Sequence, residues 1–379
     1  MTRLPLHWVC QSPSPYNDVL FRTLSGSRVF GLQLHYLQAD CPEYFWTTPS
    51  SRYSFRFLRK RPLDWALIRA VLGDRKSIFL TACWHDPTSQ FILSALIVRR
   101  RPYLIWNDTP TTRRRNWIKE QLRRTFLSTV LSKATAVLGT GKPAMQMLAN
   151  LGAPINKLVN FPYCVDLEHF APRRSSGSSE RVVLGTCARL HRIKGLDLAI
   201  RAIARLVGSG VTGFHYRIAG AGPEELALRS LTAGLGMSDY VDFCGWIQPE
   251  DLPNFYHSLD AYLHPARFEP YGVSVIEALA CGLPVLASDQ TMAALDRVIE
   301  GESGFLHAAN DEAALCCAIE TFLQLSEQKR LDMGRAARRS ALTWTADRAL
   351  ETVDQLISES CNRVARELVA RSGGANEAV

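Results

Sequence analysis

The fold is decided by residues 264–288, which read His264-Pro-Ala-Arg-Phe-Glu269-Pro-Tyr-Gly272-Val-Ser-Val-Ile-Glu277-Ala-Leu-Ala-Cys-Gly282-Leu-Pro284-Val-Leu-Ala-Ser288. The stretch begins at the end of an apolar run, passes through a loop and a short helix from Ser274, turns at Gly282 and enters a second apolar run. This order predicts two parallel strands joined by a crossover helix. The amides of residues 272–274 and the positive end of the helix dipole would face a ligand, which suits a phosphate.

Two acids, Glu269 and Glu277, stand eight residues apart in this stretch, one in the loop and one in the first turns of the helix. Both carboxylates are placed to accept hydrogen bonds from sugar hydroxyl groups of a ligand that rests on the helix. The residues alone leave other interpretations open. Ser274 and Glu277 have the Ser-x-x-Glu spacing of a capping box, in which Glu277 would bond its own backbone, and Glu269 would then be an ordinary solvated acid.

A second signal is the stretch Gly185-Thr-Cys-Ala-Arg189-Leu-His-Arg-Ile-Lys194-Gly195, where an apolar run gives way to a helix. Arg189, with its planar fork, and Lys194, with its point charge, are suited to hold a diphosphate from two sides. Two solvated basic residues are the ordinary alternative. Farther on, Gly220-Ala-Gly222-Pro223 predicts a tight turn with close backbone packing, but it lacks the third glycine of the dinucleotide fingerprint, and no Walker loop is present.

The chain divides at a polar segment that has nothing to bury, residues 173–180. On both sides of it, short runs rich in Val, Ile and Leu alternate with helix-length segments, as in parallel sheets covered on both faces. The predicted class is α/β, with doubly wound domains over 1–172 and 181–345. We expect a helical segment over 346–371 to cross back to the first domain, and residues 372–379 to be a disordered tail. Ligands of such folds bind beyond the carboxyl ends of the strands.

Several of these motifs occur together in the order found in one known family: Arg189 with Lys194, the Gly220–Pro223 turn, Gly245, and the block from Glu269 to Glu277. Together they resemble the retaining GT-B glycosyltransferases of family 4, or glycosyl transferases group 1. The resemblance covers residues 182–344 and, more loosely, 103–170. It implies two Rossmann-like domains facing a central cleft, and retaining transfer of a hexose from a UDP- or GDP-sugar to an acceptor, in polysaccharide or glycolipid synthesis.

The resemblance also implies a role for each matching residue. Arg189 and Lys194 would neutralise the donor diphosphate, Glu277 would bind the ribose hydroxyls, and Glu269 would hold the transferred sugar. The other expected donor-binding residues are Gly220, Gly222, Trp246, Ile247, Tyr271, Gly272 and Val273. Neither a metal nor another cofactor is expected, because two cations and a helix N-terminus would stabilise the leaving group.

Acceptor-side residues are expected in loops that follow strands of the first domain. Relatives place a histidine near the anomeric carbon, where this sequence has Asn107 or Asp108. Asp108 and the histidine of a neighbouring loop, His85, are therefore candidate catalytic residues, although a structural role is the alternative for His85. The glycine-rich loop of relatives is also changed, so that Tyr16 and Asn17 become candidates for contact with the acceptor or the donor.

Charge divides unevenly along the chain. Residues 1–165 hold 23 Lys and Arg against 8 Asp and Glu, an excess of 15 positive charges, whereas the remainder carries a net negative charge. We expect this basic half to meet an anionic membrane surface that presents a lipid-linked acceptor, with a merely solvated face as the alternative. A nucleic-acid-binding protein would not explain the paired acids, so no nucleic acid is expected as a partner. A nucleotide-sugar epimerase or a phosphorylase on the same fold is the alternative enzyme.

The lengths of the apolar runs predict where the protein is located. No run approaches the roughly 20 residues of a membrane span, and the first residues do not form a secretory signal. The ten cysteines are scattered without metal-binding spacing. We therefore expect a cytoplasmic protein, at most peripheral on the cytoplasmic face of the inner membrane.

Overall fold

The computed structural model describes most of the chain, namely residues 3–39, 52–58, 64–73, 76–109, 116–172 and 181–373, with side chains up to residue 360. The predicted linker, 173–180, and the chain from residue 374 onward lie outside these ranges. The chain forms two compact units, Met1–Cys164 with Thr345–Val379, and Val165–Trp344. The domain boundaries expected from the sequence remain predictions.

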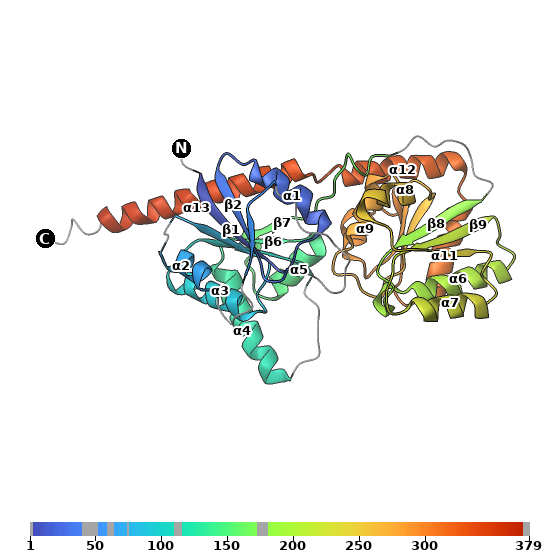
Figure 1. Ribbon diagram of the computed structural model, residues 1–379, viewed down its shortest axis with the longest axis horizontal. Helices are drawn as coiled ribbons and strands as arrows, with labels where there is room; N and C mark the ends of the chain where they lie inside the picture. The colour runs from blue at the N-terminus through green and yellow to red at the C-terminus, as the bar shows by residue number, and fades with distance from the viewer. Residues whose placement is uncertain are drawn as a thin grey trace. The chain divides into compact units, whose positions relative to one another are not determined.

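The first unit is built on a parallel sheet of seven strands in the order β3-β2-β1-β4-β5-β6-β7 (Figure 1). Its strands are β1 (Leu4–Cys10), β2 (Phe30–Tyr36), β3 (Phe55–Phe57), β4 (Ile78–Thr81), β5 (Tyr103–Asn107), β6 (Ala136–Gly139) and β7 (Leu158–Asn160). Its helices are α1 (Pro15–Ser25), α2 (Trp65–Gly73), α3 (Pro87–Val98), α4 (Trp117–Lys133), α5 (Lys142–Asn150), the short η1 (Ile155–Lys157) and α13 (Ala346–Gly373). Strands β4 and β6 are buried along their whole length, which explains their continuous apolar sequences.

The last helix, α13, belongs to the first unit although it follows the second unit in the sequence. It packs against α1, and the two lie side by side in Figure 1. Val353 and Ile357 of α13 are fully buried, and the hydroxyl of Ser27 donates a hydrogen bond to Asp354 over 2.5 Å. The helix therefore completes the core of a unit whose other elements all precede the second unit in the chain.

The second unit has a parallel sheet of six strands in the order β10-β9-β8-β11-β12-β13. The strands are β8 (Val182–Cys187), β9 (Phe214–Ala219), β10 (Val241–Gly245), β11 (Ala261–His264), β12 (Val285–Ser288) and β13 (Gly304–His307). The helices are η2 (Arg192–Lys194), α6 (Leu196–Gly208), α7 (Glu225–Gly234), η3 (Pro249–Asp251), α8 (Leu252–Tyr256), α9 (Val273–Ala280), α10 (Met292–Arg297), α11 (Glu312–Leu323) and α12 (Glu327–Ala341).

Both sheets have the strand order of a doubly wound fold. Counted from its own first strand, the second sheet runs 3-2-1-4-5-6, the order of dinucleotide-binding Rossmann domains. The order reverses between β1 and β4 in the first unit and between β8 and β11 in the second. The predicted α/β class is confirmed, and the reversal points are where loops diverge and leave room for a ligand.

Candidate functional site

The candidate site lies at the reversal point of the second sheet. There β8 and β11 are parallel neighbours, with Tyr262 opposite Gly185. The loop 188–195 leaves the carboxyl end of β8 toward α6, and the loop 265–272 leaves the same edge from β11 toward α9. Residues far apart in the sequence are thereby brought together at this edge of the sheet.

A buried ion pair joins the two loops. Lys194 Nζ donates a hydrogen bond to Glu269 Oε2, and the two side chains are only 16 % and 12 % exposed. His264 Nε2 lies 3.3 Å from the same oxygen. Burial alone would raise the pKa of Glu269, but the Lys194 ammonium and the His264 hydrogen bond lower it to about 2. Glu269 is therefore a buried, ionised acid, and the alternative of a solvated loop acid is wrong.

Close backbone packing brings the two charges within reach of each other. Gly195, which follows Lys194, has a φ of 67°, and a Cβ atom there would lie 2.0 Å from the carbonyl oxygen of Pro265. Gly272 has a φ of 101° and is the N-cap of α9. Glycine adopts both conformations without steric cost. These two glycines therefore let the loops approach each other and turn the N-terminus of α9 toward the ion pair.

Glu277, in α9, accepts a hydrogen bond of 2.7 Å from the hydroxyl of Tyr256. Burial raises the pKa of Glu277 to about 6, against smaller opposing effects of this hydrogen bond and of His169. The capping-box alternative is wrong, because Gly272 is the N-cap, Ser274 lies inside the helix, and no side chain caps this helix end. The reason is the left-handed conformation of Gly272, which starts the helix two residues earlier than a Ser274 cap would.

Glu277 and Lys194 both lie near the end of β8. The pKa of the Cys187 thiol is raised by burial and by the Glu277 carboxylate and lowered by Tyr256 and by the Lys194 ammonium, with a value of about 12. Both charges are thus close enough to Cys187 to act on it electrostatically. Arg189, half-buried, follows two residues later in the same loop. The structure therefore brings Lys194, Glu269 and Glu277 to one region at the carboxyl edge of the sheet.

The glycine turn after β9 packs against the same loop, as predicted. A Cβ atom at Gly220 would lie 1.9 Å from the carbonyl oxygen of Ala188, and one at Gly222 would lie 2.4 Å from that of Leu190. The other predicted donor-binding residues follow β10 or β11 at this edge: Trp246, Ile247, Tyr271 and Val273. Four adjacent strands therefore contribute loops to the candidate site.

In the first unit, three predicted residues lie around the carboxyl edge of the sheet. The hydroxyl of Tyr163 donates to Asp108 Oδ1 over 2.7 Å, and its ring meets that of Tyr16 edge to face, with centroids 5.1 Å apart. The amide of Asn107 donates to the carbonyl oxygen of Ala82 over 3.2 Å, which ties the loops after β4 and β5 together. Tyr16 and Asp108 are thus connected through Tyr163.

The remaining two predictions in the first unit have different surroundings. Asn17 is buried in the first turn of α1, and its Oδ1 has no hydrogen-bond partner among the described residues. His85 is exposed in the loop after β4, just before Asp86, which caps α3. Asn17 therefore has an unused acceptor, while His85 is positioned by no contact found in the described part of the chain.

Sequence reasoning missed three residues of these clusters, namely His264, Tyr256 and Tyr163. His264 ends the apolar run of β11, and a polar residue at the carboxyl end of a strand is a signal that could have been used. Tyr256 comes from α8, on the amino-terminal side of β11, and Tyr163 comes from the stretch after β7. Their side chains reach the sites only through tertiary packing, for which the sequence has no local signal.

Two features are absent from the described residues. These residues contain no group of three or more His, Cys, Asp or Glu side chains suited to hold a metal ion. Among them there is also no helix long and apolar enough to cross a membrane.

Comparison with known proteins gives a family match over part of the chain and a likeness in fold. The family described as Glycosyl transferases group 1 matches residues 170–340. A GDP-mannose-dependent alpha-(1-6)-phosphatidylinositol monomannoside mannosyltransferase of Mycolicibacterium smegmatis is 29 % identical over 241 residues, which are 60 % of this chain and 62 % of that protein. The chain thus spans less than two thirds of the length of this relative.

Solved structures resemble nearly the whole chain. A glycosyltransferase of Rickettsia africae covers 95 % of this chain and 99 % of its own, with a TM-score of 0.76 at 14 % identity. A protein of Anabaena, solved in complex with UDP, covers 94 % of this chain and all of its own, with a TM-score of 0.73 at 16 % identity. This likeness shows the fold, which is of the predicted GT-B type with two Rossmann-like units.

Proposed function

Because residues 170–340 match the family described as Glycosyl transferases group 1, we propose that this chain is a glycosyltransferase that moves a hexose from a nucleotide sugar to an acceptor. The observation that carries the proposal is the buried pair of Lys194 and Glu269 at the reversal point of a Rossmann-ordered sheet. A buried ion pair is costly to maintain, and perturbed carboxyl groups cluster at functional sites.

The donor would be a UDP- or GDP-hexose bound along the carboxyl edge of the second sheet. Lys194 and Arg189 supply cations for its diphosphate, and the amides at the start of α9 add hydrogen-bond donors with the favourable end of the helix dipole. Glu269 would accept from hydroxyls of the transferred sugar, and Glu277 from those of the ribose. Support for such a donor comes from the Anabaena neighbour that was solved with UDP.

Transfer would proceed with retention at the anomeric carbon and without a metal ion. The bond from that carbon to the phosphate oxygen breaks, and its electron pair stays on the nucleoside diphosphate. The acceptor oxygen bonds to the same face of the carbon, and its proton passes to a phosphate oxygen of the leaving group. In this mechanism, Lys194 and Arg189 accelerate transfer by stabilising the departing charge and positioning the donor.

The acceptor would be lipid-linked and held by the first unit, in glycolipid or polysaccharide synthesis. The Mycolicibacterium relative is named for a phosphatidylinositol mannoside, and the segment 1–165 carries an excess of 15 positive charges. The connected residues Tyr16, Tyr163 and Asp108 would contact the acceptor, with Asp108 as a hydrogen-bond acceptor for its hydroxyl group.

The test of this proposal is donor binding by calorimetry with UDP-glucose and GDP-mannose. We expect the variant Lys194→Met/Glu269→Gln to lose at least about tenfold in affinity, because each charge-assisted hydrogen bond is worth about 1.5–3 kcal/mol. The double variant removes both charges, so that neither stays buried alone. Lys329→Met, which removes an exposed cation of α12, is the control.

Several results would contradict the proposal. Unchanged donor affinity in a folded Lys194→Met/Glu269→Gln variant would refute the site. Donor turnover that needs no acceptor would indicate an epimerase, and dependence on free phosphate a phosphorylase. Proton NMR of the product reports the anomeric configuration, and an inverted product would refute retention.

A further inference from the structure

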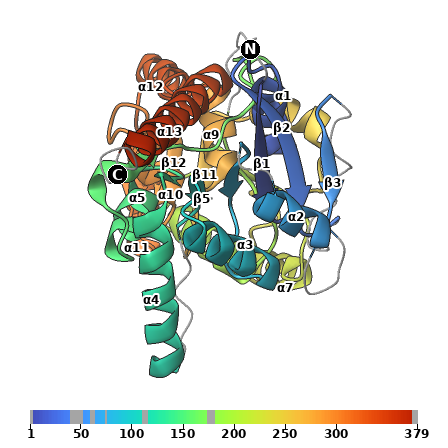
Figure 2. The ribbon, with the colours of Figure 1, turned by 90° about the vertical axis from the view of Figure 1, so that its left-hand side faces the viewer.

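Helix α4 stands out from the body of its unit with an apolar face uncovered. Figure 2 shows it running outward beyond the other helices of that unit. Trp117, Ile118 and Leu122, in its first two turns, are 74 %, 51 % and 68 % exposed. Residues buried against the unit begin only at Leu127. Because an isolated helix of this length is marginal in water, such a face is expected to gain a partner.

The exposed apolar residues lie in the first two turns of the helix. Ile118 and Leu122 are four residues apart and therefore lie on the same face. Trp117, the first residue of the helix, points about 100° away from Ile118 around the helix axis. The helix carries four basic residues and one acid, Glu120, which pairs with Arg123 over 3.0 Å. Lys119 is exposed, and so is Arg124, which also approaches Glu120 at 3.4 Å. An apolar face with Trp and flanking cations is typical of helices that lie in a lipid interface.

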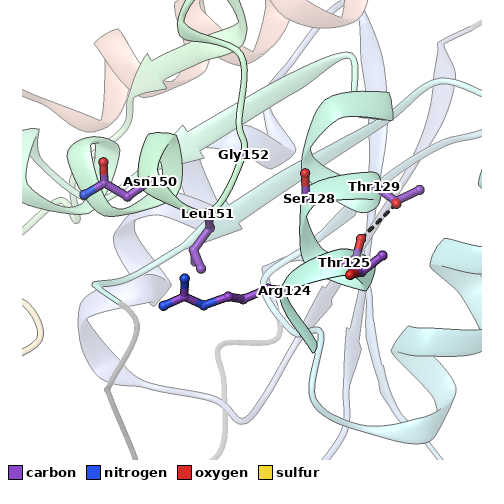
Figure 3. Close-up of a pocket in the computed structure, with 7 residues that line it drawn as sticks. All are labelled: Arg124, Thr125, Ser128, Thr129, Asn150, Leu151 and Gly152. Atoms are coloured by element: carbon purple, nitrogen blue, oxygen red, sulfur yellow. Dashed lines mark hydrogen bonds between the residues drawn. The ribbon is translucent and has the colours of Figure 1, made fainter. Parts of the chain in front are cut away.

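A hollow with a mixed polar and apolar lining follows this apolar face along the helix. It has a volume of about 420 Å³ and is lined by Arg124, Thr125, Ser128, Thr129, Asn150, Leu151 and Gly152. In Figure 3 the Arg124 side chain extends from α4 toward the end of α5. Thr125 stands seven residues after Ile118, and Thr129 seven after Leu122, so each is two turns farther on the same face. The Arg124 guanidinium suits the phosphate of a lipid headgroup, while the hydroxyls of Thr125 and Thr129 donate to backbone carbonyl oxygens of the helix.

We propose that α4 docks the protein on an anionic phospholipid bilayer, with Trp117, Ile118 and Leu122 inserted at the interface and a lipid phosphate in the Arg124 hollow. The positive excess of the segment 1–165 complements such a surface. This inference deepens the proposed function, on which it rests for the need to reach a lipid-linked acceptor. Beyond a general attraction between charges, it names α4 as the element that docks and Trp117, Ile118 and Leu122 as the residues that enter the interface.

The experiment is co-sedimentation of the full chain with vesicles, without donor or acceptor. We expect binding to vesicles of equal parts phosphatidylcholine and phosphatidylglycerol, and little binding to phosphatidylcholine alone. Trp117→Gln/Leu122→Gln should weaken binding at least about tenfold through lost apolar burial. The matched control is Ile155→Gln, which removes an apolar side chain that is 83 % exposed elsewhere in the same unit.

Arg124 is tested separately. Arg124→Gln should weaken vesicle binding about fivefold, since a basic residue at an anionic surface contributes about 1 kcal/mol. Arg28→Gln, which removes an exposed arginine outside the hollow, should change it less. Trp117→Phe should abolish most of the blue shift in tryptophan emission that vesicles cause, since Trp117 enters the interface.

The outcomes of these experiments decide whether α4 docks on a bilayer. Equal binding by wild type and the Trp117→Gln/Leu122→Gln variant would overturn the inference, as would equal binding to both kinds of vesicle. A dimer in sedimentation velocity that this variant abolishes, with no vesicle binding, would assign the face to a second copy of the chain instead. Vesicle binding without sugar transfer would leave the inference standing and overturn the proposed function.

Discussion

At the scale of single residues, the candidate donor site contains two acids in opposite electrostatic states. Glu269 lies against Lys194 and His264, and its pKa is lowered to about 2. The close partner of Glu277 is the uncharged hydroxyl of Tyr256, and burial raises the pKa of this acid to about 6. Glu269 therefore stays ionised at any physiological pH, whereas Glu277 changes its protonation state near the lower end of that range.

This difference predicts a pH dependence of donor binding that comes from Glu277. A protonated Glu277 has lost the charge that strengthens its hydrogen bonds from ribose hydroxyls, so the affinity for UDP-glucose or GDP-mannose should fall by up to about tenfold from about pH 7 to about pH 5. A nucleotide sugar has no phosphate monoester that titrates in this range. Calorimetry across the range measures the effect, and Glu277→Gln should bind weakly at every pH without this dependence.

The raised pKa of Glu277 also determines whether the free energy of unfolding rises or falls with pH. Folded Glu277 holds its proton more tightly than the unfolded chain, so the free energy of unfolding should fall as pH rises from 4.5 to about 6. The loss is on the order of 1–2 kcal/mol, and Glu277→Gln should lack it. A wild type and a Glu277→Gln variant with parallel pH profiles, in binding and in urea denaturation, would contradict the assignment.

At the scale of elements, the strands with the most continuous apolar sequences are buried along their whole length. Strands β4, β6, β11 and β12 are buried throughout, and their continuous apolar runs are evident in the sequence. The three-residue edge strand β3 has no such apolar run, and its pairing with β2 defines it. Local patterns predict elements that are buried on both faces and miss short ones that depend on a neighbour.

In the candidate site, too, the sequence indicates residues with a local signal and misses those that depend on tertiary packing. Arg189, Lys194, Glu269 and Glu277 could be proposed from the sequence because each lies in or beside a loop that follows an apolar run. The capping-box alternative for Glu277 could not be excluded from the sequence, because the left-handed conformation of Gly272 decides it. Tyr256 could not be found at all, since it reaches Glu277 from a helix that precedes β11.

Helix α13 follows the second unit in the sequence but packs in the first unit, and this arrangement predicts which unit a substitution in α13 destabilises. Ile357→Ala should lower the unfolding free energy of the first unit by about 2–5 kcal/mol, because the buried side chain leaves a cavity. Hydrogen exchange read by mass spectrometry should show faster exchange in α1 and β1 and unchanged exchange in β8 and β11. Glu351→Ala, at an exposed position of the same helix, is the control. Equal acceleration in both units would show that α13 is not confined to the first one.

At the scale of the whole molecule, the chain divides its chemistry between two units with separate cores. The first unit packs residues such as Leu93, Ile105 and Val130 together, and the second packs residues such as Ile200, Leu263 and Ile319. Charge follows the same division, since the segment 1–165 is strongly basic and the remainder is acidic. This division of charge agrees with the proposal that the basic segment meets an anionic acceptor surface while the second unit binds the donor.

This division predicts that the second unit works alone as a donor-binding domain. A fragment of residues 165–344 contains its own sheet and core and all of the proposed donor-binding residues. It should fold, as measured by circular dichroism, and bind UDP-glucose or GDP-mannose within about tenfold of the full chain, since the lost contacts would be few. It should transfer no sugar, because the acceptor residues Tyr16 and Asp108 are absent from it. A folded fragment without donor affinity would mean that the first unit supplies part of the donor site, and the assignment of the donor to β8 and β11 would then have to be revised.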